Sequence, residues 1–349
     1  MNTRRLISKR FSRSNSENVR SHYSFDRRKI IDMVKRNVTE GSTESYRMLD
    51  YSCVCGSSSG FVVSEIDRYG LPLTSIMCEN CATIRLTPFP DNESMSDFYT
   101  HYYQDMYKRS NDVRKYFDIQ KSYGKKHLAL NPQLKPGDLV IELGCGAGGA
   151  LQVFKDAGFD VAGHDFDNRL LVYGNSKGLN LHYGSILRLQ ESLKGRKAAL
   201  IFSNHVFEHI ADPFGTLLIC KEMLAEGGRI IHAVPDIYKC HNNDSYHGDL
   251  LQMIHISHIF NYTREGLSIM ASRAELSTKE LFPDASIKTP TSGMGEMWIE
   301  MWAGSGYTRM PSGNIAEKKL DILVKQEKAF KAKKNKGLFR KIWDRVRLN

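Results

Sequence analysis

The chain has 349 residues, of which 41% are hydrophobic and 25% are charged, and its formal net charge at pH 7 is +10. This composition is typical of a folded globular protein, and no apolar run approaches the roughly 20 residues that a membrane-spanning helix requires. The first residues lack the apolar core of a secretory signal, so we expect a cytoplasmic protein.

The positive charge is concentrated near the two ends of the sequence. Residues 1–50 carry 12 basic and 6 acidic side chains, and residues 316–349 carry 12 and 4, so the remainder is mildly acidic. An acidic body argues against a nucleic-acid groove, and we expect no nucleic-acid partner. The basic ends are suited to contact with a protein or with the inner face of a membrane. Nothing in the sequence predicts an oligomeric state.

Residues 1–50 are polar and rich in arginine, and we expect a basic arm that is partly disordered. Residues 51–90 contain two close cysteine pairs, Cys53-Val-Cys55 and Cys78-Glu-Asn-Cys81. Two thiolate pairs on neighbouring turns can enclose one tetrahedral zinc ion, and four protein ligands would make its role structural. We therefore expect a small zinc-ribbon-like module, with free thiols in a small sheet as the alternative.

Residues 91–133 are predicted to form a helical linker or lid. The aromatic residues within Met95–Tyr107 fall on adjacent stripes of one expected helix. We interpret them as core packing against the main domain, with Tyr103 closing over a ligand as the alternative. A further helix over Val113–Leu130 leads into that domain.

Strands and helices alternate through residues 134–283, which we take as the main domain. The expected strands lie near 138–143, 160–165, 180–183, 199–203 and 228–234. The expected helices between them lie near 149–157, 168–176 and 213–224. This alternation predicts an α/β fold with a Rossmann-like, doubly wound and mostly parallel sheet.

The first of these strands runs into a glycine-rich turn, Val140-Ile-Glu-Leu-Gly-Cys-Gly-Ala-Gly-Gly149. Alternate glycines let a ligand touch the backbone, and the following helix presents free N–H groups at its start. Asp165 ends the second strand about twenty residues later, where a carboxylate can hold ribose hydroxyls. Glu142 would repel phosphate but suits a cationic ligand. The pattern therefore predicts a site for a nucleoside that carries a positive charge.

The form E-x-G-C-G-x-G, from Glu142 to Gly148, resembles the first motif of the class I S-adenosylmethionine (SAM)-dependent methyltransferases. The segment Ile201–Pro213 resembles the segment that follows the fourth strand in that family. The resemblance implies SAM as the cofactor. The residues that it implies around SAM are Glu142, Gly144, Cys145, Gly146, Asp165, Phe166, Ser185, Asn204 and His205.

The N-terminal region adds to this resemblance. Four motifs follow one another in it: Asp67-Arg-Tyr-Gly-Leu-Pro-Leu, the second cysteine pair, Pro88-x-Pro90 and Tyr102-Tyr103. This order is similar to that of a methyltransferase subgroup with an N-terminal zinc module, which includes bacterial sugar and surface-glycan methyltransferases. It implies methyl transfer to a small molecule or glycan, above all to a sugar that is nucleotide-linked or part of a surface polysaccharide. An RNA-modifying methyltransferase and a non-catalytic SAM-binding scaffold in a glycan-assembly complex are the alternatives.

Methyl transfer to a hydroxyl or carbon requires a group that takes up a proton, and histidine does this near neutral pH. The candidates are His209, His255 and His258, with Glu208 as a further one. The H-x-x-H spacing of His255 and His258 also suggests a metal site. No third ligand is evident in the sequence, and we therefore expect no catalytic metal.

The C-terminal part of the sequence is less informative. Residues 284–315 are rich in glycine, and we expect an irregular segment. Residues 316–349 form a basic amphipathic tail with an interrupted apolar face. A membrane-surface helix, an oligomer contact and a solvated tail all fit this pattern.

Overall fold

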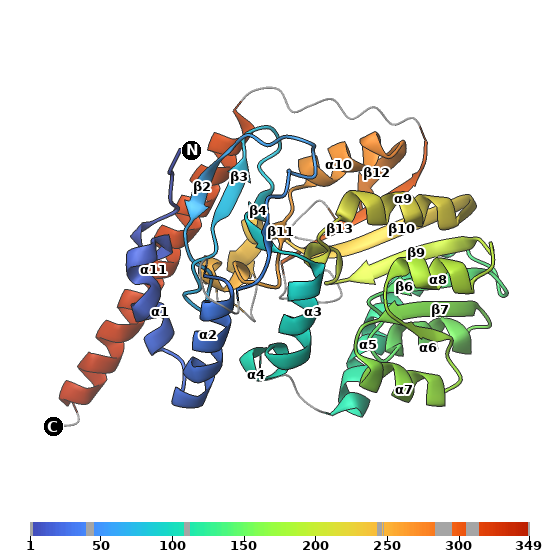
Figure 1. Ribbon diagram of the computed structural model, residues 1–349, viewed down its shortest axis with the longest axis horizontal. Helices are drawn as coiled ribbons and strands as arrows, with labels where there is room; N and C mark the ends of the chain where they lie inside the picture. The colour runs from blue at the N-terminus through green and yellow to red at the C-terminus, as the bar shows by residue number, and fades with distance from the viewer. Residues whose placement is uncertain are drawn as a thin grey trace.

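The computed structural model describes residues 3–39, 45–107, 112–242, 246, 248–282, 295–304 and 314–347. Two sheets dominate the described part of the chain (Figure 1). The larger sheet has seven strands and the smaller one four, and a two-stranded ribbon pairs β1 (Met48–Leu49) with β5 (Phe89–Pro90).

The seven-stranded sheet has the order β12-β13-β10-β9-β6-β7-β8. Its five parallel strands are β6 (Leu139–Leu143), β7 (Asp160–Asp165), β8 (Leu181–Tyr183), β9 (Ala198–Asn204) and β10 (Leu224–Pro235). The helices that alternate with them are α6 (Gly149–Asp156), α7 (Asn168–Ser176), α8 (Ile186–Ser192), α9 (Pro213–Met223) and, later, α10 (Arg264–Arg273). The predicted Rossmann-like, mostly parallel sheet is confirmed, and α8 is a helix that the sequence pattern did not indicate.

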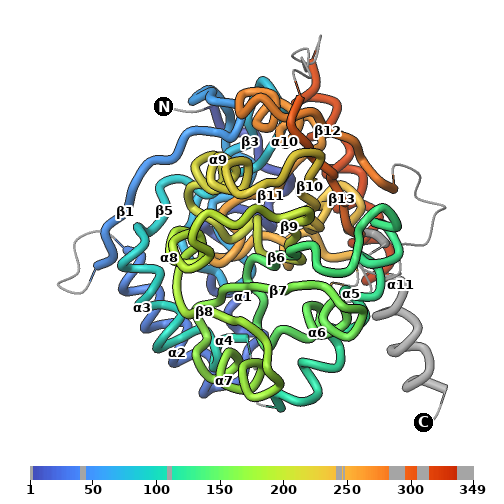
Figure 2. Tube along the Cα trace, turned by 90° about the vertical axis from the view of Figure 1, so that its right-hand side faces the viewer, coloured from blue at the N-terminus to red at the C-terminus, as the bar shows by residue number. Residues whose placement is uncertain are grey.

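The order of the strands reverses between β6 and β9. From β6 the chain passes to β7 and β8 on one side, and then returns to β9 on the other side of β6 (Figure 2). In open α/β sheets, a crevice for ligands forms outside the carboxyl ends of the strands at such a switch point. The turn after β6 and the residues at the end of β9 therefore lie on the two sides of this switch point.

Strands β12 (Leu276–Glu280) and β13 (Glu296–Ala303) extend the sheet in antiparallel pairings, β10 with β13 and β13 with β12. The expectation of an irregular segment over 284–315 is therefore wrong for 296–303. Two acidic residues, Glu296 and Glu300, interrupt the apolar run and conceal the strand pattern. Both are buried because they have partners, the Trp298 indole N–H for Glu296 and the Arg229 guanidinium for Glu300.

The four-stranded antiparallel sheet has the order β11-β4-β3-β2 and carries the cysteine pairs beside it. Its strands are β2 (Gly60–Ser64), β3 (Ser75–Cys78), β4 (Ile84–Leu86) and β11 (Phe260–Asn261). Strand β11 comes from far along the chain, after β10. The cysteine module is thus completed by a segment of the main domain and is not a unit of residues 51–90 alone.

The N-terminal region is more ordered than expected. Residues 3–39 contain the 3-10 helices η1 (Lys9–Phe11) and η2 (Arg13–Asn15) and the helices α1 (Ser16–Ser21) and α2 (Phe25–Asn37). The expectation of a partly disordered arm is wrong for these residues, because isolated apolar side chains such as Phe11, Ile31 and Val34 are fully buried. Single buried apolar residues of this kind produce no hydrophobic periodicity in a sequence that is otherwise rich in Arg and Ser.

The linker consists of three helices, α3 (Asn92–His101), α4 (Tyr103–Tyr107) and α5 (Val113–Leu130). The single aromatic helix expected over Met95–Tyr107 is broken at Tyr102. Tyr103 is buried among the rings of Phe98, Tyr99 and Tyr107, which fits the interpretation as core packing.

The C-terminal helix α11 (Ile315–Arg347) lies beside the N-terminal segment, far from strands β6 to β8 (Figure 1). Its first half is docked on the body, since Leu323 and Glu327 are buried. Among the described residues, no helix is long and apolar enough to cross a bilayer.

A charged cluster fastens α11 to the N-terminal segment. Arg10 donates hydrogen bonds to Glu327 and Asp249, and the Ser8 hydroxyl also donates to Glu327. Burial acts to raise the pKa of Glu327, but the hydrogen bonds and charge of Arg10 outweigh it and hold the pKa below its ordinary value. Removing one partner of such a pair leaves the other charge uncompensated.

We expect Glu327→Gln to lower the free energy of unfolding by about 1–3 kcal/mol at neutral pH, because Arg10 loses a charged partner. Since the pKa of Glu327 is depressed by folding, this stability is present above the ordinary carboxyl pKa. It is lost as the pH falls through the folded value, so the two proteins should converge in acid. Urea unfolding at several pH values measures this. Glu17→Gln, at an exposed ion pair, should cost less than about 1 kcal/mol, and an equal cost for both variants would contradict the account.

Candidate active site

The glycine turn after β6 has a backbone that only glycine adopts readily. Gly144, Gly146 and Gly148 have φ angles of 60°, 54° and 77°, in the left-handed region. A Cβ atom at Gly144 would lie 2.5 Å from the Val206 side chain. The turn therefore brings its backbone close to the residues that follow β9, across the switch point. The Cys145 side chain is fully buried and lies beneath β7, next to Gly163.

Asp165, at the carboxyl end of β7, is held against this turn. Its carboxylate accepts hydrogen bonds from the backbone N–H groups of Gly146 and Asp167, both at 2.8 Å. Two aromatic side chains beside it are exposed, Phe166 at 65% and Tyr183 at 55%, with ring centroids 6.3 Å apart. A carboxylate between the turn and two exposed rings suits a nucleoside, whose sugar binds the acid and whose base packs on a ring.

Ser185 follows β8 and precedes α8 as its N-cap residue. Its hydroxyl makes no capping hydrogen bond to that helix. The structure therefore places it at the same edge of the sheet as Asp165 and leaves its assigned cofactor contact a prediction.

Glu142 is 3% exposed, and its Oε2 atom has no hydrogen-bond partner among the described residues. Burial raises the pKa of this carboxyl well above its ordinary value, and the nearby charge of Asp165 adds to the shift. The Nδ2 group of Asn204, at the end of β9, is also unpartnered there, while its Oδ1 accepts from His127 Nε2 at 3.0 Å. These polar groups fit a ligand that brings both a cation and hydrogen-bonding atoms.

Helix α5 holds the glycine turn from outside the sheet. The Gln120 amide donates to the Cys145 carbonyl at 2.8 Å and accepts from the Gly149 N–H at 3.4 Å. Gly124, one turn later, allows α5 to approach α6 so closely that a Cβ atom would lie 2.4 Å from the Ala150 carbonyl oxygen. We did not predict the role of Gln120, because its partners are backbone atoms that no sequence motif indicates.

The four predicted catalytic residues lie together. Glu208 Oε1 is 3.7 Å from His209 Nε2 and 3.9 Å from His258 Nε2. The rings of His209 and His258 are 4.9 Å apart, and those of His255 and His258 are 3.7 Å apart. Glu208 and His209 lie on the 3-10 helix η3 (Phe207–His209), directly after β9. The cluster thus lies beside the switch point of the sheet.

His205 belongs to this cluster through its side chain. Its Nε2 atom is 2.6 Å from Glu296 Oε1, and its Nδ1 atom is 3.7 Å from Glu208 Oε1. Burial acts to lower the pKa of His205, but the two carboxylates outweigh burial and raise it to about 10. The imidazole is therefore protonated at neutral pH. Its predicted contact with the cofactor stays a prediction, and Glu296 is a site residue that we missed because it lies in the segment expected to be irregular.

The segment that carries His255 and His258 is held by the cysteine module and by α4. The Asp67 carboxylate accepts from the Ile256 N–H at 3.2 Å, and the Arg68 N–H donates to the Ile254 carbonyl at 2.8 Å. The Tyr107 hydroxyl is 2.7 Å from His255 Nδ1. Tyr107, the last residue of α4, thus contacts the histidine segment.

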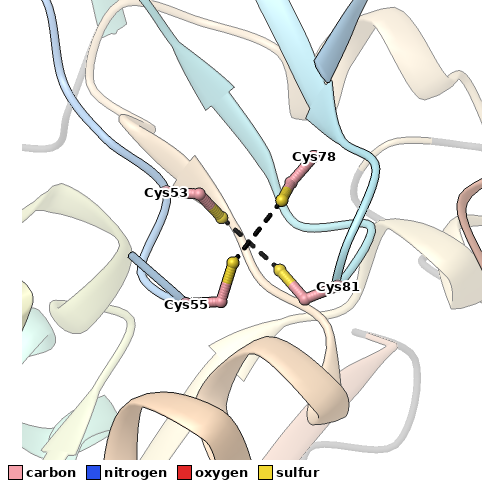
Figure 3. A group of neighbouring side chains, drawn as sticks. All are labelled: Cys53, Cys55, Cys78 and Cys81. Atoms are coloured by element: carbon pink, nitrogen blue, oxygen red, sulfur yellow. Dashed lines mark hydrogen bonds between the residues drawn. The ribbon is translucent and has the colours of Figure 1, made fainter. Parts of the chain in front are cut away.

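The four cysteines of the two pairs converge on one point (Figure 3). The Sγ atoms of Cys53 and Cys81 are 3.4 Å apart, and those of Cys55 and Cys78 are 3.5 Å apart. All four sulfur atoms lie within 4.8 Å of one another. A tetrahedral zinc ion with Zn–S bonds of about 2.3 Å requires sulfur atoms about 3.8 Å apart, so the set fits zinc.

Comparison with known proteins identifies the central part of the chain. The family described as "Methyltransferase domain" matches residues 115–278. Over these residues the chain is similar to methyltransferase domains. The match spans α5, the glycine turn, Asp165 and the cluster around Glu208, and it confirms the class of protein to which the sequence motifs pointed.

Curated relatives are methyltransferases of low identity. The ubiquinone biosynthesis O-methyltransferase of Cereibacter sphaeroides is 27% identical over 96 residues, which are 26% of this chain and 39% of that protein. The C-methyltransferase NovU of Streptomyces niveus is 25% identical over 178 residues, 50% of this chain and 40% of that protein. The chain thus spans about two fifths of the length of these relatives. A solved structure, magnesium protoporphyrin IX methyltransferase of Synechocystis, aligns with a TM-score of 0.45 and 14% identity over 61% of this chain and 100% of that one.

The close approach of α5 to α6 gives a test of how the site is built. We expect Gly124→Ala to destabilise the methyltransferase domain by about 1–3 kcal/mol, because the new methyl group has no space against the Ala150 backbone. Denaturant unfolding measures this, with Ser122→Ala on the exposed side of α5 as the control near zero. A Gly124→Ala protein as stable as the wild type would show that the two helices do not lie this close.

Proposed function

We propose that the protein transfers a methyl group from SAM to a small-molecule acceptor. One observation carries the proposal most strongly. In the part of the chain that resembles a methyltransferase domain, Glu142 is a buried carboxylate whose Oε2 atom has no hydrogen-bond partner among the described residues. It lies just before a left-handed glycine turn that is itself hydrogen-bonded to Asp165. The cation and the ribose of SAM match these two acids.

Different residues at the crevice would bind different parts of the cofactor. Asp165 would accept hydrogen bonds from the ribose hydroxyls, and Phe166 or Tyr183 would pack on the adenine. Glu142 would face the positively charged amino-acid end, with the Asn204 amide beside it. When bound, SAM supplies a methyl carbon already activated by the sulfonium. The chain itself must then bind, align the acceptor and take up its proton.

Proton uptake is assigned to the cluster of Glu208, His209, His255 and His258. His255 and His258 are deeply buried, and burial, followed by nearby positive groups, lowers the pKa of each well below its ordinary value. Both are therefore neutral at pH 7. A neutral imidazole is suited to receive a proton from an acceptor hydroxyl or carbon.

For the acceptor we propose a sugar, either nucleotide-linked or part of a surface polysaccharide. The support is the resemblance carried by the Asp67–Leu73 motif and the cysteine pairs. The structure adds that this same motif holds the histidine segment, so the part of the chain that carries the resemblance is in contact with the site where an acceptor would bind.

The cofactor assignment is tested with two aspartates of one strand. Asp165→Ala should weaken SAM binding about 10–100-fold, because it removes charged hydrogen bonds to the ribose. Asp160→Ala, at the exposed start of β7, should bind as the wild type does. Isothermal titration calorimetry with SAM measures both. Unchanged affinity in a folded Asp165→Ala protein would contradict the assignment.

We also propose that Cys53, Cys55, Cys78 and Cys81 hold a structural zinc ion, which would stabilise a module with little core of its own. Elemental analysis should then find one tightly held zinc ion per chain. Cys81→Ser should lose it and lower the melting temperature, whereas Cys220→Ala, at a buried cysteine of α9, should retain it. Zinc content that is equal in both variants would remove the assignment.

A further inference from the structure

We propose that Glu208, His209 and His258 form a second metal site, which binds a divalent first-row transition-metal ion at the acceptor side of the crevice. The ligand atoms of these three residues lie within 4.8 Å of one another. Two histidines and one carboxylate on one side of an ion leave its other positions open. The third ligand that the sequence did not reveal is thus Glu208, and the histidine that pairs with His258 is His209 instead of His255.

The hydrogen bonds of the two histidines support this role. His209 Nδ1 bonds to the Ser257 backbone carbonyl, and His258 Nδ1 lies 3.3 Å from the Met253 carbonyl. A carbonyl can only accept, so each Nδ1 carries a proton, and Nε2 is the ring nitrogen of each histidine that can bind an ion. Metal-binding histidines are characteristically oriented in this way, with the other ring nitrogen donating to a backbone carbonyl or carboxylate.

Both Nε2 atoms lie near the same carboxylate oxygen. The distances from Glu208 Oε1 are 3.7 Å to His209 Nε2 and 3.9 Å to His258 Nε2, which are too long for hydrogen bonds. Bonds of about 2.0–2.2 Å to a tetrahedral ion would separate such atoms by about 3.3–3.6 Å, so these two distances would each shorten by a few tenths of an ångström.

Glu208 needs a partner that the described residues do not supply. The side chain is 1% exposed, and neither carboxylate oxygen has a hydrogen-bond partner in the described part of the chain. Leaving a buried carboxylate without hydrogen bonds costs several kcal/mol. The charged His205 ring, at 3.7 Å, balances part of the charge without making a hydrogen bond. A bound cation would satisfy the carboxylate directly.

The neighbours of the three ligands make the site rigid. The His255 ring packs on His258 with centroids 3.7 Å apart and is itself held by the Tyr107 hydroxyl. His209 follows Glu208 directly on η3, so two ligands come from one short element and the third from the segment fixed by the cysteine module. The set is separate from the four cysteines and has a different chemistry, with nitrogen and oxygen instead of sulfur.

One consequence rests on the proposed function. An acceptor hydroxyl that binds an open position of the ion becomes more acidic, as water does on zinc. Its proton would pass to His255, which is not a ligand of the ion, while the oxygen attacks the methyl carbon and the carbon–sulfur bond breaks to give a neutral thioether. The ion would thus leave His255 as the base, because His209 and His258 would be occupied by coordination.

Metal binding is tested directly, with Zn²⁺ or Co²⁺ as the probe on the full chain. Equilibrium dialysis and elemental analysis should show a second ion per chain beyond the one held by the cysteines. Glu208→Gln and His258→Asn should each weaken the second ion at least about tenfold and keep the first. His182→Gln, on β8 away from the cluster, should keep both. Retention of the first ion in each variant also shows that the protein is folded.

A wild-type protein that takes up no second ion would overturn the proposal, as would a second ion that persists in both Glu208→Gln and His258→Asn. Calorimetry with SAM on the same proteins separates this from the proposed function. Normal SAM binding without a second ion would reject only the metal site. A second ion without SAM binding would reject only the methyltransferase assignment.

Discussion

The pairing of β11 with β4 is the contact on which the rest of the site depends. It joins a segment that follows the last parallel strand to the antiparallel sheet of the cysteine module. The Leu86 N–H donates to the Ile259 carbonyl at 2.9 Å, and the Thr263 hydroxyl donates to the Cys81 carbonyl at 2.6 Å. His255 and His258 lie immediately before this pairing. Backbone hydrogen bonds to the cysteine module therefore fix the segment that carries these two histidines.

Buried charge is the second constraint on the molecule. Glu142, Glu208 and Glu296 are nearly inaccessible at the carboxyl edge of one sheet. Among the described residues, Glu142 Oε2 and both carboxylate oxygens of Glu208 have no hydrogen-bond partner, whereas Glu296 has His205 and Trp298 as partners. Uncompensated carboxylates destabilise a fold. Their presence at the crevice is explained if each carboxylate binds a positively charged ligand. The ligand would be a sulfonium cofactor at Glu142 and a metal ion at Glu208. At these residues, the side chains that would bind ligands thus lower the stability of the protein without them.

The sequence predicts the architecture correctly where the hydrophobic periodicity and the positions of glycine are informative. Strand β7 and helices α5 and α7 lie at the expected residues, because each has a clear apolar pattern and a terminating turn. The glycine turn and Asp165 meet as predicted, since both follow neighbouring parallel strands. Strand β13 was missed because two buried glutamates interrupt it, and the order of residues 3–39 was missed because it rests on a few isolated anchors.

The fold brings the predicted catalytic residues Glu208, His209, His255 and His258 together through β9, η3 and β11. No local pattern in the sequence shows that two of these histidines lie close to Glu208. Gln120, Tyr107 and Glu296 act through tertiary contacts to backbone or to other side chains. Only the fold reveals such residues, because their partners are distant in sequence.

The central claim is that this chain moves a methyl group, and the most direct measurement follows that group. The protein is incubated with SAM labelled in the methyl carbon and with an extract of metabolites, nucleotide sugars and glycans, and the labelled product is found by mass spectrometry. The account predicts label in a small-molecule or glycan acceptor with the wild-type protein and its loss with Asp165→Ala. SAM binding without any labelled acceptor across such extracts would contradict it and would leave a cofactor-binding scaffold.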